Sequence, residues 1–378
     1  MEQRRYGYKY AIIRSNGLCY AIEDTTTYVL DPLYVPIEDD TIEAIYEANK
    51  HMARIFSKGG GVGTDISILR PRNAKVNNAA KSSTGAVSFL DLFNETGNVI
   101  SQHGRRGATM VSIDCSHPDI EELLDTKMKG DRLQSMNVSI KFTDEFMTAV
   151  DCDKPYTLKF DVKSTGEHIE KTIKAREFFK KFCECQWNWG DPGALFIDRF
   201  NDYNMLSGYD NFRILTTNPC AELPLGAWGS CNLGSINLAK FVDMYTGKFC
   251  WDSFIDTVHV AVRALNDALD YSYDKQPYEE NRKYIRDWRP IGLGVFGYAD
   301  MLVDLGLKYG SEEALEFTRK LFHCLTNEAV KASALLCQDY FNTFGEYDYD
   351  KTADSKFFQS LDDETKEFVK EYGLLNGQ

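Results

Sequence analysis

Segments whose apolar residues recur at helical spacing alternate with short apolar runs along this chain. After Thr41, apolar residues recur every three or four positions up to Phe56, and Gly59 ends the run. This pattern predicts a helix capped by Thr41. Further helices are predicted at residues 86–102, 118–128, 175–187, 254–271 and 311–341.

Short runs with a continuous or alternating apolar pattern predict strands between these helices. They lie at residues 34–37, 109–113 and 137–142, and a meander of charged strands is predicted at 155–173. The first 30 residues are rich in Tyr and Thr and predict two or three short strands of their own.

The segment at residues 218–238 interrupts this alternation and holds the densest set of reactive side chains. It has two prolines and three glycines within 17 residues, which argues for an extended or looped backbone. Alternate residues of an extended segment share a face, so Asn218, Cys220 and Glu222 are predicted to project together. Cys231 lies beyond a glycine-rich turn and is expected to fold back towards them.

This set of groups favours radical chemistry over hydrolysis. A hydrolytic thiolate needs a histidine beside it, and the segment contains none. A thiol used for hydrogen-atom transfer needs instead a dry pocket, a carboxylate that accepts a hydroxyl proton, an orienting amide and a second thiol as reductant.

The motifs Asn218-Pro219-Cys220-Ala221-Glu222 and Ser230-Cys231-Asn232-Leu233-Gly234 resemble the finger loop of ribonucleotide reductase large (catalytic) subunits. Further blocks support the resemblance from about residue 32 to 378: Ser57 to Gly63, Ile66 to Pro71, Gly104 to Ala108, His117 to Ile120 and Arg289 to Val295. The sequences of these blocks are most similar to those of the adenosylcobalamin-dependent class II enzymes.

The resemblance implies a ten-stranded α/β barrel of the ribonucleotide reductase and glycyl-radical type, incomplete at its C-terminal side. Residues 1–30 do not match the family, and residues 31–378 would form a partial catalytic barrel that includes the finger loop at 216–232. A half barrel leaves sheet edges unpaired, so a C-terminal large-subunit fragment is an expected partner, together with a second copy of the chain in a homodimer.

The resemblance also implies roles for single residues in reducing ribonucleotides to deoxyribonucleotides. Cys220 would carry the thiyl radical, Glu222 would take the 3'-hydroxyl proton, Asn218 would orient the sugar and Cys231 would supply reducing equivalents. Gly60 and Gly61 would present backbone to the substrate ribose. The radical would come from adenosylcobalamin or, alternatively, from a dimetal small subunit.

Two loops resemble those that bind a nucleoside triphosphate effector, ATP or a deoxynucleotide, in this family. In the first, at residues 70–85, Arg70 would hold the effector phosphates, and Asp39 or Asp40 would hold its ribose. The second spans residues 129–135 and would bind through Lys129, Arg132 and Gln134 while relaying effector identity to the substrate site.

One departure from the family concerns the redox thiols. Pro32 stands where the family carries the second cysteine of its thiol pair, and Cys19 lies 13 residues upstream of that position. A catalytically inert remnant or a nucleotide-binding regulatory module is therefore an alternative. A glycyl-radical enzyme is another, although the Ser-Cys-Asn-Leu-Gly block argues against it.

Composition narrows the remaining classes of function. The chain has 378 residues, 43% of them hydrophobic, and a formal net charge of −14, which argues against nucleic acid or an anionic membrane as partner. No apolar run is long enough to span a membrane and no signal peptide is recognisable, so a cytoplasmic location is expected. No metal site is predicted from the single Cys183-Glu184-Cys185.

Two glycine-rich segments suggest nucleotide folds that their context argues against. Gly59 to Gly63 lacks the Gly-Lys-Ser/Thr of a phosphate loop. Gly292 to Gly297 has the spacing Gly-x-Gly-x-x-Gly, but no buried strand precedes it, so a dinucleotide-binding fold is not predicted.

Overall fold

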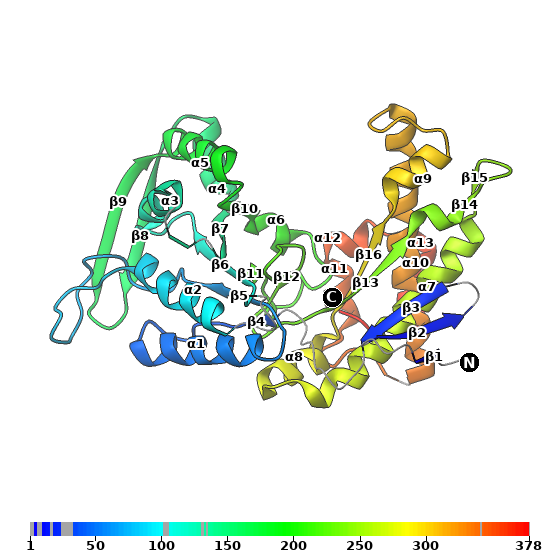
Figure 1. The fold of residues 1–378 in the computed structure, drawn as a ribbon, viewed down its shortest axis with the longest axis horizontal. Coiled ribbons are helices and arrows are strands. Elements are labelled where there is room, and N and C mark those ends of the chain that lie inside the picture. Colours follow the sequence, from blue (N-terminus) through cyan, green and yellow to red (C-terminus); the bar gives the residue numbers. More distant parts are fainter. Residues whose placement is uncertain are drawn as a thin grey trace. The chain divides into compact units, whose positions relative to one another are not determined.

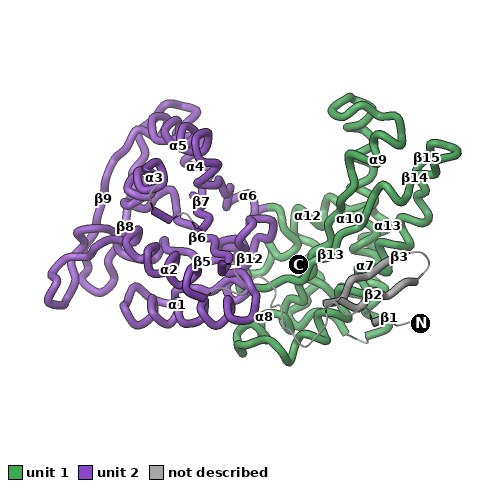
Figure 2. Tube along the Cα trace, in the orientation of Figure 1, with its two compact units in different colours: residues 1–27, 203–212, 230–378 green, residues 28–202, 213–229 purple. Residues whose placement is uncertain are grey.

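A computed structural model describes residues 33–100, 106–129, 132–133, 135–340 and 342–377, together with the backbone of three short strands before them. The chain divides into two compact units (Figure 2). Unit 1 comprises residues 1–27, 203–212 and 230–378, and unit 2 comprises residues 28–202 and 213–229.

Unit 2 is built on a five-stranded sheet with the strand order β10-β7-β6-β5-β4, in which every neighbouring pair is parallel (Figure 1). Its strands are β4 (Leu33–Tyr34), β5 (Val62–Asp65), β6 (Thr109–Asp114), β7 (Asn137–Phe142) and β10 (Gly193–Phe196). The central strands are buried along nearly their whole length, as expected for a parallel sheet that is covered by its crossover helices.

Helices connect these strands in the order expected of α/β units. They are α1 (Ile42–Phe56), η1 (Ala86–Phe89) with α2 (Leu90–Val99), α3 (Ile120–Lys129), α4 (Asp144–Asp151), α5 (Ala175–Trp189) and α6 (Ile197–Asp202). The two-stranded antiparallel ribbon of β8 (Pro155–Val162) and β9 (Glu167–Lys174) follows α4.

Local sequence explains where these helices begin and end. The Thr41 hydroxyl accepts a hydrogen bond from the Ala44 amide at 3.2 Å and so caps α1, as predicted. Gly190 ends α5 in the left-handed conformation with φ 71°, which costs glycine little. Phe142 packs against Phe146 and Phe182, so the aromatic residues of β7, α4 and α5 form one core.

Unit 1 contains a parallel pair of strands, β13 (Asn232–Asn237) and β16 (Ile291–Phe296), against which apolar helix faces pack. Its helices are α7 (Trp251–Ser272), α8 (Glu279–Trp288), α9 (Tyr298–Asp304), α10 (Glu312–Tyr340), α11 (Tyr349–Asp354), α12 (Lys356–Gln359) and α13 (Asp363–Tyr372). Short elements complete it: η2 (Leu238–Phe241), η3 (Tyr273–Lys275), and the ribbon of β14 (Val242–Asp243) and β15 (Lys248–Phe249).

Near the N-terminus, β1 (Arg4–Arg5), β2 (Tyr10–Ser15) and β3 (Leu18–Glu23) pair in antiparallel order, which confirms the predicted short strands. The helix predictions at 254–271 and 311–341 are also confirmed, by α7 and α10. The predicted strand at 34–37 was too long, because β4 ends at Tyr34.

The Gly-x-Gly-x-x-Gly run has its first two glycines inside strand β16. In a dinucleotide-binding fold they would follow a strand and open a helix, so the observed position agrees with the rejection of that fold. The architecture is mixed α/β, as expected. No helix among the described residues is long and apolar enough to cross a membrane.

Candidate active site

A small hairpin carries Cys220. Strands β11 (Thr216–Thr217) and β12 (Pro224–Leu225) pair in antiparallel order and, with the tip at residues 218–223, form what we term the finger hairpin. In the tip, the Asn218 carbonyl accepts the Ala221 amide at 3.0 Å, and the Asn218 side-chain oxygen accepts the Leu223 amide at 3.0 Å. Ala221 has φ 65°, so the backbone reverses here.

This reversal corrects the expectation that Asn218, Cys220 and Glu222 share the face of an extended segment. The tip is a turn, in which alternate residues no longer project to one side. Cys220 and Glu222 are exposed, whereas Asn218 is 1% exposed. The two prolines excluded a helix but could not distinguish a strand from a tight turn.

Glycines before and within β5 explain how the finger hairpin lies against the sheet. A Cβ atom on Gly63 would lie 2.0 Å from the Thr217 carbonyl oxygen, and one on Gly61 would lie 2.6 Å from Cγ of Pro219. Only glycine permits this approach of two backbones. Gly60 is buried and donates its amide to Ile55. That Gly60 and Gly61 contact a substrate ribose stays a prediction.

The side-chain amide nitrogen of Asn218 has no hydrogen-bond partner among the described residues, although it is buried. Leaving such a donor unpaired costs about 1–3 kcal/mol unless a ligand or a solvent molecule accepts its hydrogen bond. Asn218 therefore offers an unused donor at the tip that carries the thiol.

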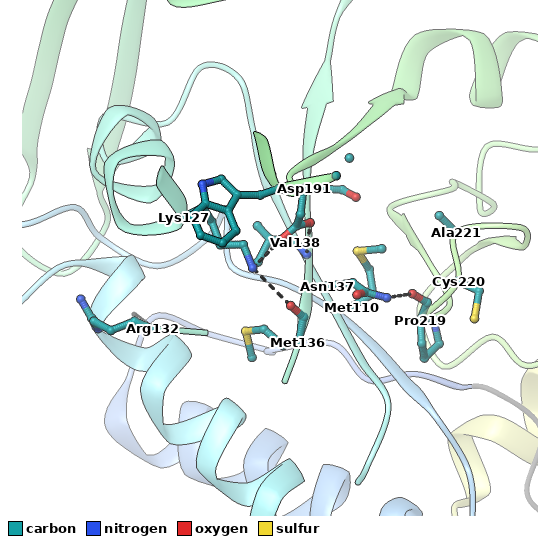
Figure 3. Close-up of a pocket in the computed structure, with 14 residues that line it drawn as sticks. Met110, Lys127, Arg132, Met136, Asn137, Val138, Asp191, Pro219, Cys220 and Ala221 are labelled. Atoms are coloured by element: carbon teal, nitrogen blue, oxygen red, sulfur yellow. Dashed lines mark hydrogen bonds and ion pairs between the residues drawn. The ribbon is translucent and has the colours of Figure 1, made fainter. Parts of the chain in front are cut away.

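A cleft of about 500 Å³ lies beside Cys220 in unit 2 (Figure 3). That volume suits a small organic ligand, and the lining combines apolar surface with a few polar groups, as in many binding sites. The lining residues are Met110, Lys127, Arg132, Met136, Asn137, Val138, Ser139, Trp189, Gly190, Asp191, Gly193, Pro219, Cys220 and Ala221.

A buried charged network that sequence reasoning missed supports the base of the finger hairpin. The Thr216 and Ser112 hydroxyls lie 2.7 Å apart, and Ser112 donates to the Asp65 carboxylate. Lys141 forms ion pairs with Asp65 at 2.7 Å and with Asp114 at 2.9 Å. Burial alone would lower the pKa of Lys141, but the two carboxylates outweigh it and raise that pKa. The signal in the sequence that could have indicated this network is the presence of charged residues within otherwise apolar strands.

The residues predicted to hold the effector are partly brought together. The Arg70 Nε lies 2.7 Å from the Asp40 carboxylate, whose other oxygen accepts the Arg70 amide at 3.1 Å. Arg70 also donates to the Lys75 carbonyl at 2.9 Å, and Asp39 is exposed. Asp40 and Arg70 therefore meet as neighbours and neutralise each other.

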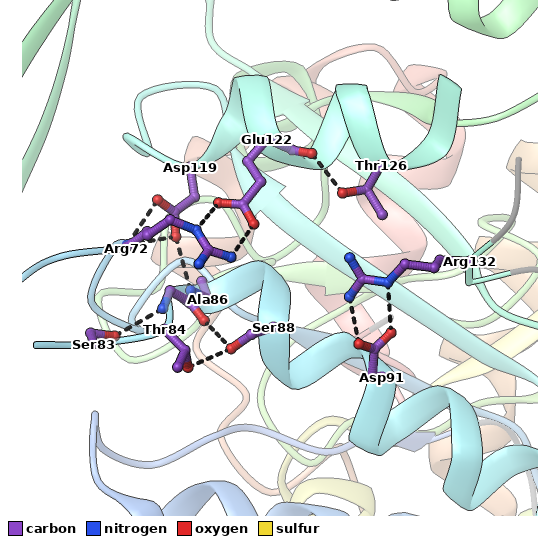
Figure 4. Close-up of polar contacts among 11 residues, drawn as sticks. Arg72, Ser83, Thr84, Ala86, Ser88, Asp91, Asp119, Glu122, Thr126 and Arg132 are labelled. Atoms are coloured by element: carbon purple, nitrogen blue, oxygen red, sulfur yellow. Dashed lines mark hydrogen bonds and ion pairs between the residues drawn. The ribbon is translucent and has the colours of Figure 1, made fainter. Parts of the chain in front are cut away.

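Asp119 closes the first of the two predicted effector loops at both ends (Figure 4). Its carboxylate accepts the amide of Arg72 at 3.0 Å and that of Ala86 at 2.9 Å. His117 accepts the Asp119 amide through Nδ1 and pairs through Nε2 with the Leu69 carbonyl at 2.8 Å. Burial lowers the pKa of His117 and raises that of Asp119, whereas the backbone amides of Arg72 and Ala86 oppose the shift of Asp119.

The second predicted effector loop is described only in part, and Gln134 lies outside the described residues. Arg132 pairs with Asp91, with its Nε 3.2 Å from one carboxylate oxygen, and Lys129 is exposed. Residues of this loop and of α2 line a hollow of about 490 Å³; the lining is Asp91, Asn94, Asn98, Arg106, Arg132, Leu133 and Ser135.

Cys231 belongs to unit 1 and is 3% exposed. Its thiol lies 3.4 Å from the Asn232 carbonyl, and a Cβ on Gly292 would lie 3.3 Å from its sulfur. Its expected proximity to Cys220 stays a prediction. The Cys19 side chain and Pro32 lie outside the described residues, and no cluster suited to a metal ion occurs within them.

Comparisons with known proteins identify relatives of this chain. The chain is 40% identical over 302 residues to a vitamin B12-dependent ribonucleoside-diphosphate reductase of Thermoplasma acidophilum, covering 79% of this chain and 38% of the relative. Identity to a protein of the same name from Mycobacterium tuberculosis is 37%, covering 81% and 43%. A vitamin B12-dependent ribonucleotide reductase of Rhodopirellula baltica is 28% identical, covering 80% and 31%. The chain thus spans less than half the length of these relatives.

The family model described as "Ribonucleotide reductase, barrel domain" matches residues 27–378. This match begins a few residues before the point at which sequence motifs became recognisable and extends through both units. The chain belongs to the ribonucleotide reductase family.

Proposed function

We propose that this chain is part of a ribonucleotide reductase catalytic subunit, which reduces ribonucleotides to deoxyribonucleotides by thiyl-radical chemistry. The observation that carries the proposal is the buried, unpaired side-chain amide nitrogen of Asn218. It belongs to the same hairpin tip as Cys220, which lines a cleft of nucleoside size. An amide donor with no protein partner suits a ligand hydroxyl.

Three residues of the hairpin tip and Cys231 each have one role in the proposed reaction. The Cys220 thiyl radical abstracts the 3'-hydrogen of the ribose, and Glu222 takes the proton of the 3'-hydroxyl. Asn218 donates its amide to a sugar hydroxyl and holds C3' towards the sulfur. Water then leaves from C2', and Cys231 supplies hydrogen and reducing equivalents. Its redox partner would be Cys19, a thiol of another chain or an external reductant.

The oxidising radical is proposed to come from adenosylcobalamin, as the names of the relatives suggest, or else from a dimetal small subunit. A cleft of about 500 Å³ beside Cys220 accepts a nucleoside but not a corrin ring with its side chains. The residues lining this cleft therefore do not fit the cofactor.

The ten-stranded barrel and its completion by a separate C-terminal chain belong to the same proposal. The parallel sheet of β4 to β7 and β10 would supply its first half, and β13 with β16 would contribute to the second. An effector, ATP or a deoxynucleoside triphosphate, would bind along the two loops, and a homodimer is proposed as the assembly.

The test is a Cys220→Ser variant assayed for deoxynucleotide production with the partner chain and radical source supplied. Production should be abolished while nucleotide binding, measured by calorimetry, is retained. Cys183→Ser, at an exposed thiol on α5, is the matched control and should stay active. Deoxynucleotide production by the Cys220 variant would refute the radical assignment.

A second candidate function is a nucleotide-binding regulatory module without reductase activity. Pro32 in place of the expected redox cysteine favours it. This function predicts that the chain binds an effector and that Arg70→Ala abolishes the binding. It also predicts no reduction of ribonucleotides with any combination of partner chain and radical source.

A further inference from the structure

Asn137 follows the predicted second effector loop and contacts the finger hairpin. It is the first residue of β7, and its side-chain nitrogen donates to the Pro219 carbonyl at 2.7 Å (Figure 3). Pro219 immediately precedes Cys220. This side chain therefore helps to fix the backbone from which the thiol projects.

The segment before Asn137 is held from the opposite direction by Lys127, a buried residue near the end of α3. Its ammonium group donates to the Leu133 carbonyl at 3.0 Å and approaches the Met136 carbonyl at 3.5 Å. It also forms an ion pair with Asp191. These three acceptors use all the donors of the ammonium group, so Lys127 holds the loop rather than a ligand anion.

Further contacts fix the conformation of the same loop. Leu133 has φ 58°, which is unusual for a bulky residue, and is 2% exposed. Such a conformation persists where surrounding contacts impose it, and it often marks segments that move in function. The Ser135 amide donates to the Asn94 side chain at 3.2 Å, so α2 holds the loop as well.

We propose that Asn137 is a positioning residue through which Leu133, Ser135 and Met136, which precede it, set the place of the Cys220 thiol. Met136 and Asn137 are adjacent, so a shift of the carbonyl held by Lys127 moves the Asn137 side chain and, through it, Pro219. A misplacement of about 1 Å can slow a reaction by about 100-fold, so a small shift suffices. The inference rests on the proposed function, in which Cys220 reacts and the loop senses effector.

The first experiment replaces the donor and keeps the shape. Asn137→Asp has the same size but offers no N–H to Pro219, and the residue is exposed, so folding should be unaffected. Hydrogen exchange of the Ala221 and Leu223 amides, followed by mass spectrometry, should rise about threefold or more, with the thermal midpoint unchanged. Exchange at the wild-type rate in this variant would overturn the proposal.

The second experiment tests whether the loop acts through Asn137. In the wild-type background, Lys127→Met should accelerate hydrogen exchange of the tip amides. In the Asn137→Asp background, the same substitution should cause no further acceleration. Additive effects would show that the loop reaches the tip by another route and would refute the inference. Asn94→Ala frees the Ser135 amide and replaces Lys127→Met if that variant does not fold.

Asn188→Asp is the matched control, since Asn188 is exposed on α5 and lies outside the loop and the hairpin. It should leave exchange of the tip unchanged. All measurements use the chain without substrate or effector. Loss of the coupling is therefore distinguishable from failure of the proposed reaction, which is tested separately by Cys220→Ser.

Discussion

Lys141 is the group on which the buried network under the finger hairpin depends. It is 5% exposed and pairs with two carboxylates, of which Asp65 is 6% exposed. Lys141→Met keeps much of the side-chain volume and removes the charge. The variant would leave the Asp65 carboxylate buried without its cation, and the Thr216 hydroxyl would rest on a disrupted network.

The size of the effect follows from this burial. Removing one partner of a buried ion pair costs about 3–5 kcal/mol, because the remaining charge is uncompensated. Asp114 contributes little, since its side chain is 44% exposed and water screens it. The raised pKa of Lys141 means that its stabilising contribution is complete below the usual value of 10.5 and is lost only as pH rises through the folded-state pKa. The full loss is therefore expected at pH 7.

Hydrogen exchange at increasing urea concentration separates the two units, because peptides from β6 and β13 report on each alone. Lys141→Met should lower the stability measured in β6 and leave that in β13 unchanged. Adding Asp65→Asn should restore more than half of the lost stability, because it removes the carboxylate that Lys141 no longer neutralises. Lys159→Met, at an exposed site on β8, is the control. Equal stability of Lys141→Met and the control would refute the reasoning.

Three further predictions concern separate sites. Gly63→Ala should cost unit 2 about 3 kcal/mol in urea unfolding, because its Cβ would lie 2.0 Å from the Thr217 oxygen. Asp119→Ala should free both ends of the loop at residues 70–85, and trypsin should cleave there about tenfold faster. Burial raises the pKa of Cys337 to about 12 from 9.0, so the folded state keeps a neutral thiol while the unfolded state ionises. The contribution of this thiol to the free energy of unfolding is then intact below pH 9 and falls as pH rises above it. Between pH 8 and 10 the free energy of unfolding should therefore fall by about 1 kcal/mol less in Cys337→Ala than in the wild type.

Each of these changes has a matched control. Gly294→Ala places its Cβ 3.5 Å from the nearest atom and should be tolerated in β16. Asp125→Ala removes an exposed carboxylate from α3, the helix that directly follows Asp119, and should leave trypsin cleavage unchanged. Cys183→Ala removes an exposed thiol and should keep the wild-type dependence on pH. An effect in a control equal to that in its partner would contradict the corresponding prediction.

The sequence predicted best those elements whose signals are local. The cap at Thr41 and the apolar spacing of α7 and α10 depend on residues within one or two turns of each other. The reactive tip around Cys220 was found because its residue types are dense in a segment unable to form a helix. Its turn was missed, since the positive φ of Ala221 is imposed by hydrogen bonds to Asn218 and not by a glycine.

Contacts between residues far apart in the chain could not be predicted in this way. The link from Asn137 to Pro219 joins positions 82 residues apart, and nothing near either one indicates it. The pairing of Lys141 with Asp65 left only a weak signal, a charge inside an otherwise apolar strand. The partial neutralisation of Arg70 by Asp40 likewise required the fold, because it depends on where the loop places both groups.

The glycines before and within β5 show how one pattern supports two different interpretations. From the sequence, the run at Gly59 to Gly63 suggested a turn or a backbone surface for substrate. In the structure, Gly61 and Gly63 occupy alternate positions, and the finger hairpin lies against the side-chain face that both leave empty. Alternate glycines in a buried strand therefore indicate that another backbone crosses that face. Because the hairpin that crosses here carries Cys220, the glycines fix the height of the thiol above the sheet even where no ligand contacts them.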